Sequence, residues 1–331
     1  CIYIHIYEMT TRGLLNVYQL SRTARLQGPR ALAESVREQM SLQHRILAEG
    51  SFRRPAILDI FQGQASLNEL PGDLNGYALD LKRQLQTEVD RLVSDGNKWG
   101  GYASTPQKYR QPINEVFSHC FYTLATLDIL IASSDEAVDL DGTHLLANPC
   151  DVRHLTACVA DDMQGLSIEK FGVCPEISIL PNRADFVSPV DGVWSLLHYT
   201  CVEIVKNSIQ AVIERFGELE IDDLDDPPIV VDCSNANEWV FEDQGTGLIA
   251  GSTESVFNAL SSTREKREPN YTYSREFGIP FSGAGIGLLK SKTYLGMHNA
   301  SIQACSRGED DSNGRGTTVT VRFDSGPGTS T

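Results

Sequence analysis

Apolar residues recur at helical intervals through the first 140 residues of this 331-residue chain. Three segments show the pattern: 30–49, 74–96 and 111–138. In the second of them, Leu85 and Val89 follow one another at the spacing of a single turn. Such spacing places apolar side chains on one face of a helix, and that face has to be buried against a neighbour. The pattern therefore predicts a helical bundle whose neighbouring helices run antiparallel.

A different pattern begins after residues 139–151, where Gly, Asn and Pro cluster as they do in loops between domains. Short apolar runs typical of strands lie between and after two long helical segments, 150–172 and 191–217. The expected strands cover residues 175–181, 229–234, 238–243, 300–306 and 317–323. This order predicts an α/β sandwich in which helices cover one face of a mixed sheet.

Composition narrows the class of protein. The formal net charge of -16 argues against a nucleic-acid-binding surface, which needs a basic face. The acidity either maintains solubility or complements a basic partner. No apolar run reaches the roughly 20 residues that span a bilayer, so no membrane span is expected. The eight cysteines form no CxxC pair, which favours reduced thiols over a disulfide framework or a zinc site.

The N-terminal composition bears on domain organisation. Residues 9–29 contain Arg12, Arg22 and Arg25, several hydroxyl residues and no acidic residue. This composition is typical of a mitochondrial presequence and equally compatible with a basic first helix. The expected organisation is a variable N-terminus or presequence remnant at 1–28, a helical bundle at 29–145, an α/β domain at 150–325 and a short flexible tail at 326–331.

Chemistry-bearing residues occur on the second long helix, in the segment "EIVKNSIQA". Glu203 and Asn207 lie one turn apart there and share a helix face. An Asn carbonyl oxygen can ligate Mg²⁺, and a neighbouring Glu can accept a proton. Taken alone, the pair is better explained by an exposed polar helix face.

The segment "EDQGTGL" follows a predicted strand. Asp243, at the end of that strand, is a suitable acceptor for an exocyclic amine such as that of adenine. Gly245 and Gly247 let the backbone approach a ligand without a clash from a Cβ atom. Taken alone, this pattern is more often a tight turn than a nucleotide site.

Two further glycine-containing segments follow. In "FSGAGIGLL", Gly283, Gly285 and Gly287 precede a helical pattern, and backbone N–H groups at a helix N-terminus bind phosphates. The spacing differs from a P-loop, and no strand precedes it as the dinucleotide fingerprint requires. In "GRGTTVTVRF", Gly316 and Thr317 open the last strand, where a hydroxyl either reaches a bound base or simply begins the strand.

The order of these segments is more specific than any one of them. Glu-x-x-x-Asn on a helix, then DxGxG, then GxGxG, then GT before a terminal strand resembles the GHKL (Bergerat) ATP-binding fold of histidine kinases, type II topoisomerases and Hsp90-type chaperones. The expected fold class is therefore α+β, with an N-terminal helical bundle followed by a GHKL α/β sandwich. The glycines of the third segment resemble the end of an ATP lid.

The connecting segments resemble the mitochondrial 2-oxoacid dehydrogenase kinases, the pyruvate and branched-chain enzymes. "EIVKNSIQA" is similar to the family's ELxKNxMRA, and "FNALSST" to FNYxYST at the start of the lid. "IPFSGAGIGLLKSKTYLGMHNASIQACS" is similar to PLxGFGYGLPxSRxYAxYFxGxLxLxS, with matching spacing. The resemblance extends over residues 150–323, is patchy over 113–138 and is thin before that.

The resemblance implies an ATP-dependent protein serine kinase that phosphorylates the decarboxylase subunit of a 2-oxoacid dehydrogenase complex and thereby inactivates the complex. Pyruvate dehydrogenase is the first candidate for this complex. It also implies a homodimer in the mitochondrial matrix that docks on lipoyl domains. By position, Glu203 is the general base and Asn207 the Mg²⁺ ligand, and a requirement for K⁺ stays open. The implied nucleotide-binding residues are Asn207, Asp243, Gly245, Gly247, Leu248, Ser262, Thr263, Gly283, Ala284, Gly285, Ile286, Gly287, Leu288 and Thr317.

Five positions depart from the family pattern. Tyr199 stands where many members have His, and Gln210 where the motif has Arg. Ala125, Ile129 and Asp135 occupy the places of two arginines and a histidine in FYTNRISFRMLINQH. A second class of function therefore stays open, that of an ATP-binding scaffold without catalytic activity. A third, a sensor-type histidine kinase, is disfavoured because no acceptor His is present at that last position.

Overall fold

A computed structural model describes most of the C-terminal half of the chain and parts of the N-terminal half. The described residues are 79, 82–83, 85–87, 89–94, 105–134, 150–180, 189–190, 193–217, 221, 224, 226–235, 237–248, 253–261, 285–307 and 315–323. The chain divides into two compact units, Cys1–Thr143 and His144–Thr331. The predicted presequence and the first predicted bundle helix lie outside the described residues.

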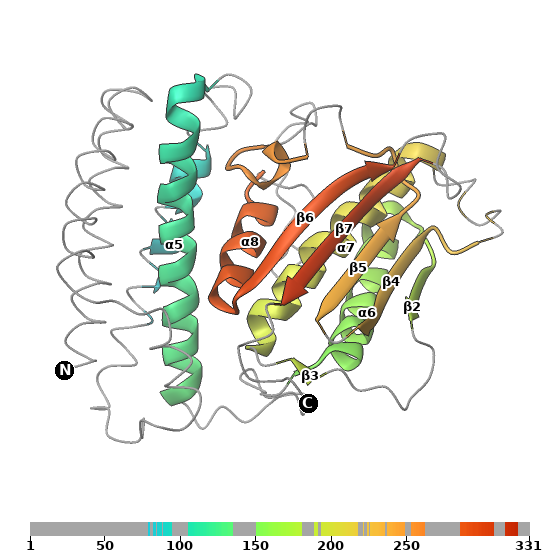
Figure 1. The fold of residues 1–331 in the computed structure, drawn as a ribbon, viewed down its shortest axis with the longest axis horizontal. Coiled ribbons are helices and arrows are strands. Elements are labelled where there is room, and N and C mark those ends of the chain that lie inside the picture. The colour runs from blue at the N-terminus through green and yellow to red at the C-terminus, as the bar shows by residue number, and fades with distance from the viewer. Residues whose placement is uncertain are drawn as a thin grey trace. The chain divides into compact units, whose positions relative to one another are not determined.

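The long helix of the first unit is α5, Gln107–Ser134 (Figure 1). Its buried apolar residues, among them Phe117 and Phe121, recur at the predicted helical spacing. Leu85 and Val89, in the helical stretch that precedes α5, are also buried. Both described stretches are therefore helical as predicted, while the rest of the predicted bundle lies outside the described residues.

The second unit is built on a five-stranded mixed sheet with the order β2-β4-β5-β7-β6. β2 runs parallel to β4, and all other neighbours are antiparallel. A separate two-stranded sheet pairs β1 with β3. The strands are β1 (Cys150–Asp151), β2 (Ile177–Leu180), β3 (Pro189–Val190), β4 (Ile229–Asn235), β5 (Glu238–Asp243), β6 (Ala300–Arg307) and β7 (Gly316–Phe323).

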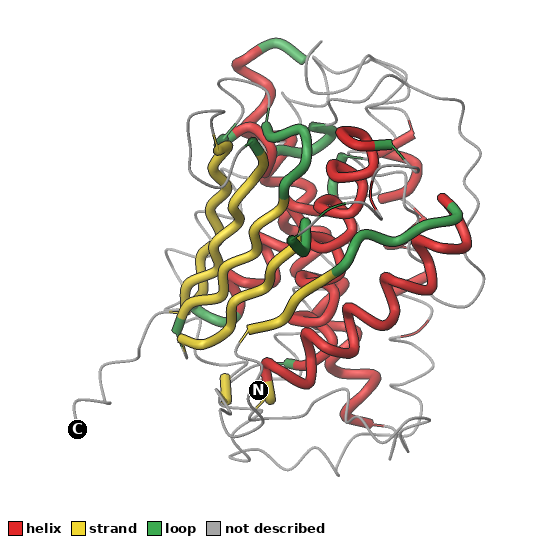
Figure 2. The backbone as a smooth tube through the Cα atoms, turned by 90° about the vertical axis from the view of Figure 1, so that its right-hand side faces the viewer, coloured by secondary structure: helices red, strands yellow, loops and turns green. Residues whose placement is uncertain are grey.

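Three helices cover one face of this sheet: α6 (Val152–Phe171), α7 (Trp194–Phe216) and α8 (Gly287–Met297). The strands form one layer and the helices the next (Figures 1 and 2). α7 is central, because it packs against α6 and α8 and also contacts β5 and β7. The core lies between the layers and includes Trp239, Phe241 and Val321 from alternate strand positions.

The predicted α/β sandwich with helices on one face of a mixed sheet is confirmed. Both predicted strand pairs are present as the antiparallel hairpins β4–β5 and β6–β7. A short 3₁₀ turn, Ser255–Phe257, was not predicted. Among the helices that the structure describes, none combines the length and apolar character needed to cross a bilayer.

His298 connects the end of α8 to the start of α7. Its Nε2 accepts a hydrogen bond from the backbone N–H of Val193 at 2.9 Å, and its Nδ1 donates to the Tyr294 carbonyl oxygen at 2.8 Å. This pattern requires the neutral ring, since a protonated Nε2 cannot accept. Burial lowers the pKa of His298, which also favours the neutral ring.

His298→Leu should lower the melting temperature more at pH 8 than at pH 5. A depressed folded-state pKa gives stability that is present above the unfolded pKa, near 6.5, and is lost as pH falls through the folded value. At pH 8 the variant should lose about 1–2 kcal/mol, the usual contribution of two hydrogen bonds. Thermal unfolding at both pH values measures this, and an equal loss at both would contradict it.

Candidate functional site

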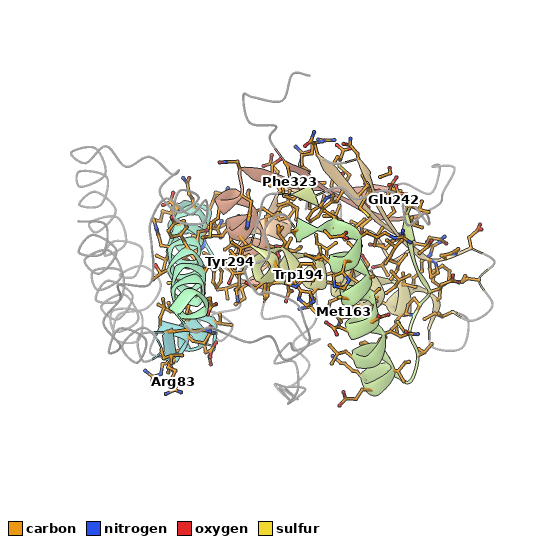
Figure 3. All side chains as sticks on the ribbon, turned by 90° about the horizontal axis from the view of Figure 1, so that it is seen from below. Arg83, Met163, Trp194, Glu242, Tyr294 and Phe323 are labelled. Atoms are coloured by element: carbon orange, nitrogen blue, oxygen red, sulfur yellow. The ribbon has the colours of Figure 1, made fainter. Side chains whose placement is uncertain are left out.

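Polar side chains are buried in the middle of α7, a helix that is otherwise largely apolar. The exposed fractions of Glu203, Lys206 and Ser208 are 6%, 2% and 4%. Asn207, between them, is half-buried. Burying charged groups is costly unless they are paired, so each of these residues should have a partner in the fold. α7 begins at Trp194, and Tyr294 lies on the neighbouring helix α8 (both labelled in Figure 3).

The carboxylate of Glu203 is held from both directions along α7. Nζ of Lys206, three residues on, lies 2.6 Å from Oε1 of Glu203. The hydroxyl of Tyr199, one turn earlier, donates a hydrogen bond to the same carboxylate. Burial, and then the negative charge of Glu203, raise the pKa of Tyr199 well above its ordinary value. Tyr199 therefore stays protonated and remains a donor.

α8 closes this region from the other side. Lys290 lies over the Tyr199 ring, 4.2 Å from its centroid, and Tyr294 meets the same ring edge to face at 5.4 Å. A Cβ atom on Gly287 would collide with Oε2 of Glu203. A side chain at position 287 would therefore displace the Glu203 carboxylate from the position seen here. Glu203 is thus enclosed by its own helix and by the start of α8.

Asp243 ends β5 and is the second buried carboxylate. It follows Trp239 and Phe241 at alternate positions, so it points to the helix-covered face, and it is 3% exposed. Its Oδ1 accepts hydrogen bonds from the backbone N–H groups of Gly245 at 2.9 Å and Thr317 at 3.1 Å. Burial nevertheless raises the pKa of Asp243, because desolvation outweighs these bonds.

The hydrogen bond from Ser208 to Asp243 joins the two parts of the site. Ser208 Oγ donates to Oδ2 of Asp243 at 3.3 Å. Asn207 is the residue next to Ser208 on α7, and Glu203 lies one turn earlier. The strand-end carboxylate and the polar segment of α7 therefore meet in the interior of one unit.

Glycine residues shape the rim of the site. Leu248, which follows Gly247, donates its backbone N–H to Ser306 Oγ at 3.1 Å, so the chain after β5 runs beside the end of β6. Gly285 has a φ of 73°, and its carbonyl oxygen accepts a hydrogen bond from the Ser261 N–H at 3.1 Å. This bond holds Gly285, just before the start of α8, against Ser261.

The N-terminus of α8 has the chemical features of an anion-binding site. Ile286 is the N-cap residue and provides no side-chain cap, and the first turn, which includes Gly287 and Leu288, carries no acidic residue. The leading N–H groups of a helix have no partner within the helix and attract anions. The backbone N–H groups at the start of α8 thus lie within one turn of the contact between Gly287 and Glu203.

The structure brings several of the residues selected from sequence into two groups. One group surrounds Asp243 and includes Gly245 and Thr317, and another surrounds Glu203 and includes Gly287. Four selected residues lie outside the described part of the chain: Ser262, Thr263, Gly283 and Ala284. Of the departures from the family pattern, Ala125 and Gln210 are buried, and the side chains of Ile129 and Asp135 are not described.

Four residues that the structure places in or beside the site were not among those selected from sequence. Lys206 could have been found, because residues three apart on a helix can form an ion pair. Ser208, Arg215 and Arg307 carry no such signal, since their partners lie between 29 and 100 residues away. Within the described ranges, no group of three or more His, Cys, Asp or Glu residues could hold a metal ion.

No protein-family model matches the chain. A Drosophila melanogaster protein, pyruvate dehydrogenase (acetyl-transferring) kinase, mitochondrial, is 33% identical over 111 residues, which are 33% of this chain and 25% of that protein. An Arabidopsis thaliana protein of the same name is 29% identical over 152 residues, 44% of this chain and 40% of that protein. The chain thus spans less than half the length of these relatives.

A solved structure titled "Mycobacterial sensor histidine kinase MprB" also aligns with this chain. The alignment covers 54% of this chain and 97% of that one, with a TM-score of 0.35 and 14% identity.

Asp243→Asn should gain stability relative to the parent protein as pH rises. Asn keeps an acceptor oxygen for the N–H groups of Gly245 and Thr317 but carries no charge. A raised folded-state pKa gives Asp243 a contribution that is complete below about pH 4 and is lost as pH rises through the folded value. The melting temperature of the variant minus that of the parent should therefore be larger at pH 7.5 than at pH 4.5.

Thermal unfolding at the two pH values measures this difference. Asp232→Asn, which removes the same charge from the opposite face of the sheet, is the matched control. A difference for Asp243→Asn that does not change with pH would show that burial of the charge has no energetic cost.

Proposed function

We propose that this chain is an ATP-dependent protein serine kinase acting on the decarboxylase subunit of a mitochondrial 2-oxoacid dehydrogenase complex, pyruvate dehydrogenase being the first candidate. The observation that carries the proposal is the hydrogen bond between Ser208 and Asp243. It brings the predicted adenine-binding carboxylate to the helix that holds Glu203 and Asn207. The partial similarity to two mitochondrial pyruvate dehydrogenase kinases supports the same choice of substrate.

The donor set around Asp243 fits an adenine base. A carboxylate offers about four acceptor positions. In this structure three are used, by Gly245, Thr317 and Ser208. One position is thus left for the exocyclic amine of adenine, and the low exposure of Asp243 would strengthen that bond.

The other end of the site fits magnesium and phosphates. Mg²⁺ usually keeps several waters and takes one or two protein ligands in addition to substrate phosphates. Half-buried Asn207 would be that protein ligand, on the helix face that it shares with Glu203. The uncapped start of α8 supplies backbone N–H groups for phosphate oxygens.

The chemistry assigned to the chain's own residues is positioning and proton transfer. When bound, Mg-ATP supplies the phosphoryl group and neutralises much of its charge. Glu203 would accept the proton of the substrate serine hydroxyl, which leaves the serine oxygen as the attacking nucleophile. Lys206 and Tyr199 hold the carboxylate of Glu203 in one orientation during this step. Gln210 contributes no charge at the place where the related motif has Arg.

The wider assignment follows from the same family resemblance. We propose a homodimer in the mitochondrial matrix, in which the helical domain docks on lipoyl domains of the complex. The direct test is transfer of labelled phosphate from ATP to the decarboxylase subunit of the pyruvate or branched-chain complex, with the matching lipoyl domain present. Absence of transfer to either subunit by protein that binds Mg-ATP would overturn the kinase assignment.

Glu203→Gln should leave Mg-ATP affinity near that of the parent and lower phosphate transfer on the order of 10²–10⁴-fold, the usual contribution of general base catalysis. The substitution leaves the Lys206 charge buried without its counter-ion, which can destabilise the fold. The double variant Glu203→Gln/Lys206→Met removes both charges and separates the two effects. Full transfer activity in a folded Glu203→Gln protein would contradict the assignment of the base.

Asn207→Ala should abolish Mg-ATP binding or turnover while the melting temperature stays close to that of the parent. The reason is that half-buried Asn207 is assigned to a metal and not to the core. Titration calorimetry with Mg-ATP, together with thermal unfolding, provides the measurement. Unchanged affinity and turnover would remove Asn207 from the metal site.

One observation favours a second function, an ATP-binding scaffold without catalysis. The Glu203 carboxylate is already paired with Lys206 at 2.6 Å, which competes with its use as a base. A scaffold would bind Mg-ATP and show neither hydrolysis nor transfer, so affinity and turnover measured on the same preparation distinguish the two functions.

A further inference from the structure

Arg215, in the last turn of α7, connects two loops that are far apart in the sequence. Its Nη1 donates to the carbonyl oxygen of Gln244 at 2.8 Å and to that of Arg315 at 2.6 Å. The two acceptors lie 29 and 100 residues from Arg215 along the chain. The guanidinium group itself is on the surface and also lies over the ring of Phe216, 4.7 Å from its centroid.

Both acceptor carbonyls belong to backbone segments that hold Asp243. Gln244 lies between Asp243 and Gly245, whose N–H is one of the donors to Oδ1. Arg315 comes two residues before Thr317, whose N–H is the other donor. Arg215 therefore ties together, from outside the site, the two segments that set the direction of the carboxylate.

Other contacts also hold the backbone of residues 243–246. Arg307, on β6, donates to the carbonyl oxygen of Asp243. The Gln244 N–H donates to the Pro228 carbonyl oxygen at 2.9 Å, and the Thr246 N–H donates to the carbonyl oxygen of Ala211 on α7 at 3.2 Å. Arg215 also reaches Arg315, the residue before β7, while Arg307 lies opposite Gly316, the first residue of β7.

We propose that Arg215 is a positioning residue that orients the Asp243 carboxylate and so makes the site select adenine over guanine nucleotides. This inference rests on the proposed ATP site. Adenine presents an amine at the ring position where guanine presents a carbonyl oxygen. A fixed carboxylate accepts a hydrogen bond from the amine and repels the carbonyl, and one that can turn away discriminates less.

Loss of the Arg215 guanidinium should change the melting temperature by only a few degrees, because hydrogen bonds at an exposed site contribute little to stability. If Arg215 only supported the fold, its loss would weaken the binding of ATP and of GTP by the same factor. The ratio of the two affinities therefore separates positioning from stability.

The test compares Arg215→Met and Arg215→Lys with the control Arg322→Met in the full chain. Arg322 is an arginine on β7 that pairs with Glu238 and has a side chain 52% exposed. Dissociation constants for Mg-ATP and Mg-GTP come from titration calorimetry, and melting temperatures from thermal unfolding. Met keeps the aliphatic stem without donors, while Lys can satisfy only part of the two-carbonyl contact.

We expect the parent and Arg322→Met to prefer ATP strongly. In Arg215→Met the ratio of GTP to ATP dissociation constants should fall about tenfold, mainly through weaker ATP binding, with an intermediate value for Arg215→Lys. Equal weakening of both nucleotides, or an unchanged ratio, would overturn the role of Arg215 and leave the proposed function standing. If the parent binds neither nucleotide, the proposed function itself fails.

Discussion

The burial of the Asp243 carboxylate beneath α7 is the constraint on which the site depends. A charged group in this position is stable only if the surrounding backbone and side chains supply donors. Two backbone N–H groups and the hydroxyl of Ser208 do so. Meeting this requirement holds the end of β5, the start of β7 and the middle of α7 in one arrangement. That arrangement also fixes where Asn207 and Glu203 lie relative to the sheet.

α7 serves the second carboxylate in the same way. Lys206 and Tyr199 lie on the same helix as Glu203, so local spacing brings them to it. The start of α8 then approaches because Gly287 has no side chain to prevent it. The two carboxylates are compensated differently. Asp243 accepts three neutral hydrogen bonds and has the charge of Arg307 nearby, while Glu203 is paired directly with Lys206 and accepts a hydrogen bond from Tyr199. In the proposed function the first recognises an amine and the second accepts a proton.

Much of the fold could be predicted from local pattern. Alternation along residues 229–243 and 300–323 predicts the two hairpins, since each period-2 run is followed closely by its partner. The order of strands in the sheet could not be predicted in this way, because β2 pairs with β4 across about 50 intervening residues. Within the candidate site, the shared helix face of Glu203 and Asn207 could be predicted from helical spacing, and the place of Asp243 at a strand end from the strand pattern. The contacts of Ser208 and Arg215 could not, because they exist only once distant segments pack together.

We propose that α7 and the end of β5 form the two ends of one nucleotide site. A crystal structure of the protein with Mg²⁺ and a non-hydrolysable ATP analogue tests this most directly. We expect the adenine amine within hydrogen-bonding distance of Asp243, Mg²⁺ bound to Oδ1 of Asn207 and the phosphates at the start of α8. A nucleotide bound elsewhere, or bound with its base away from Asp243, would contradict it.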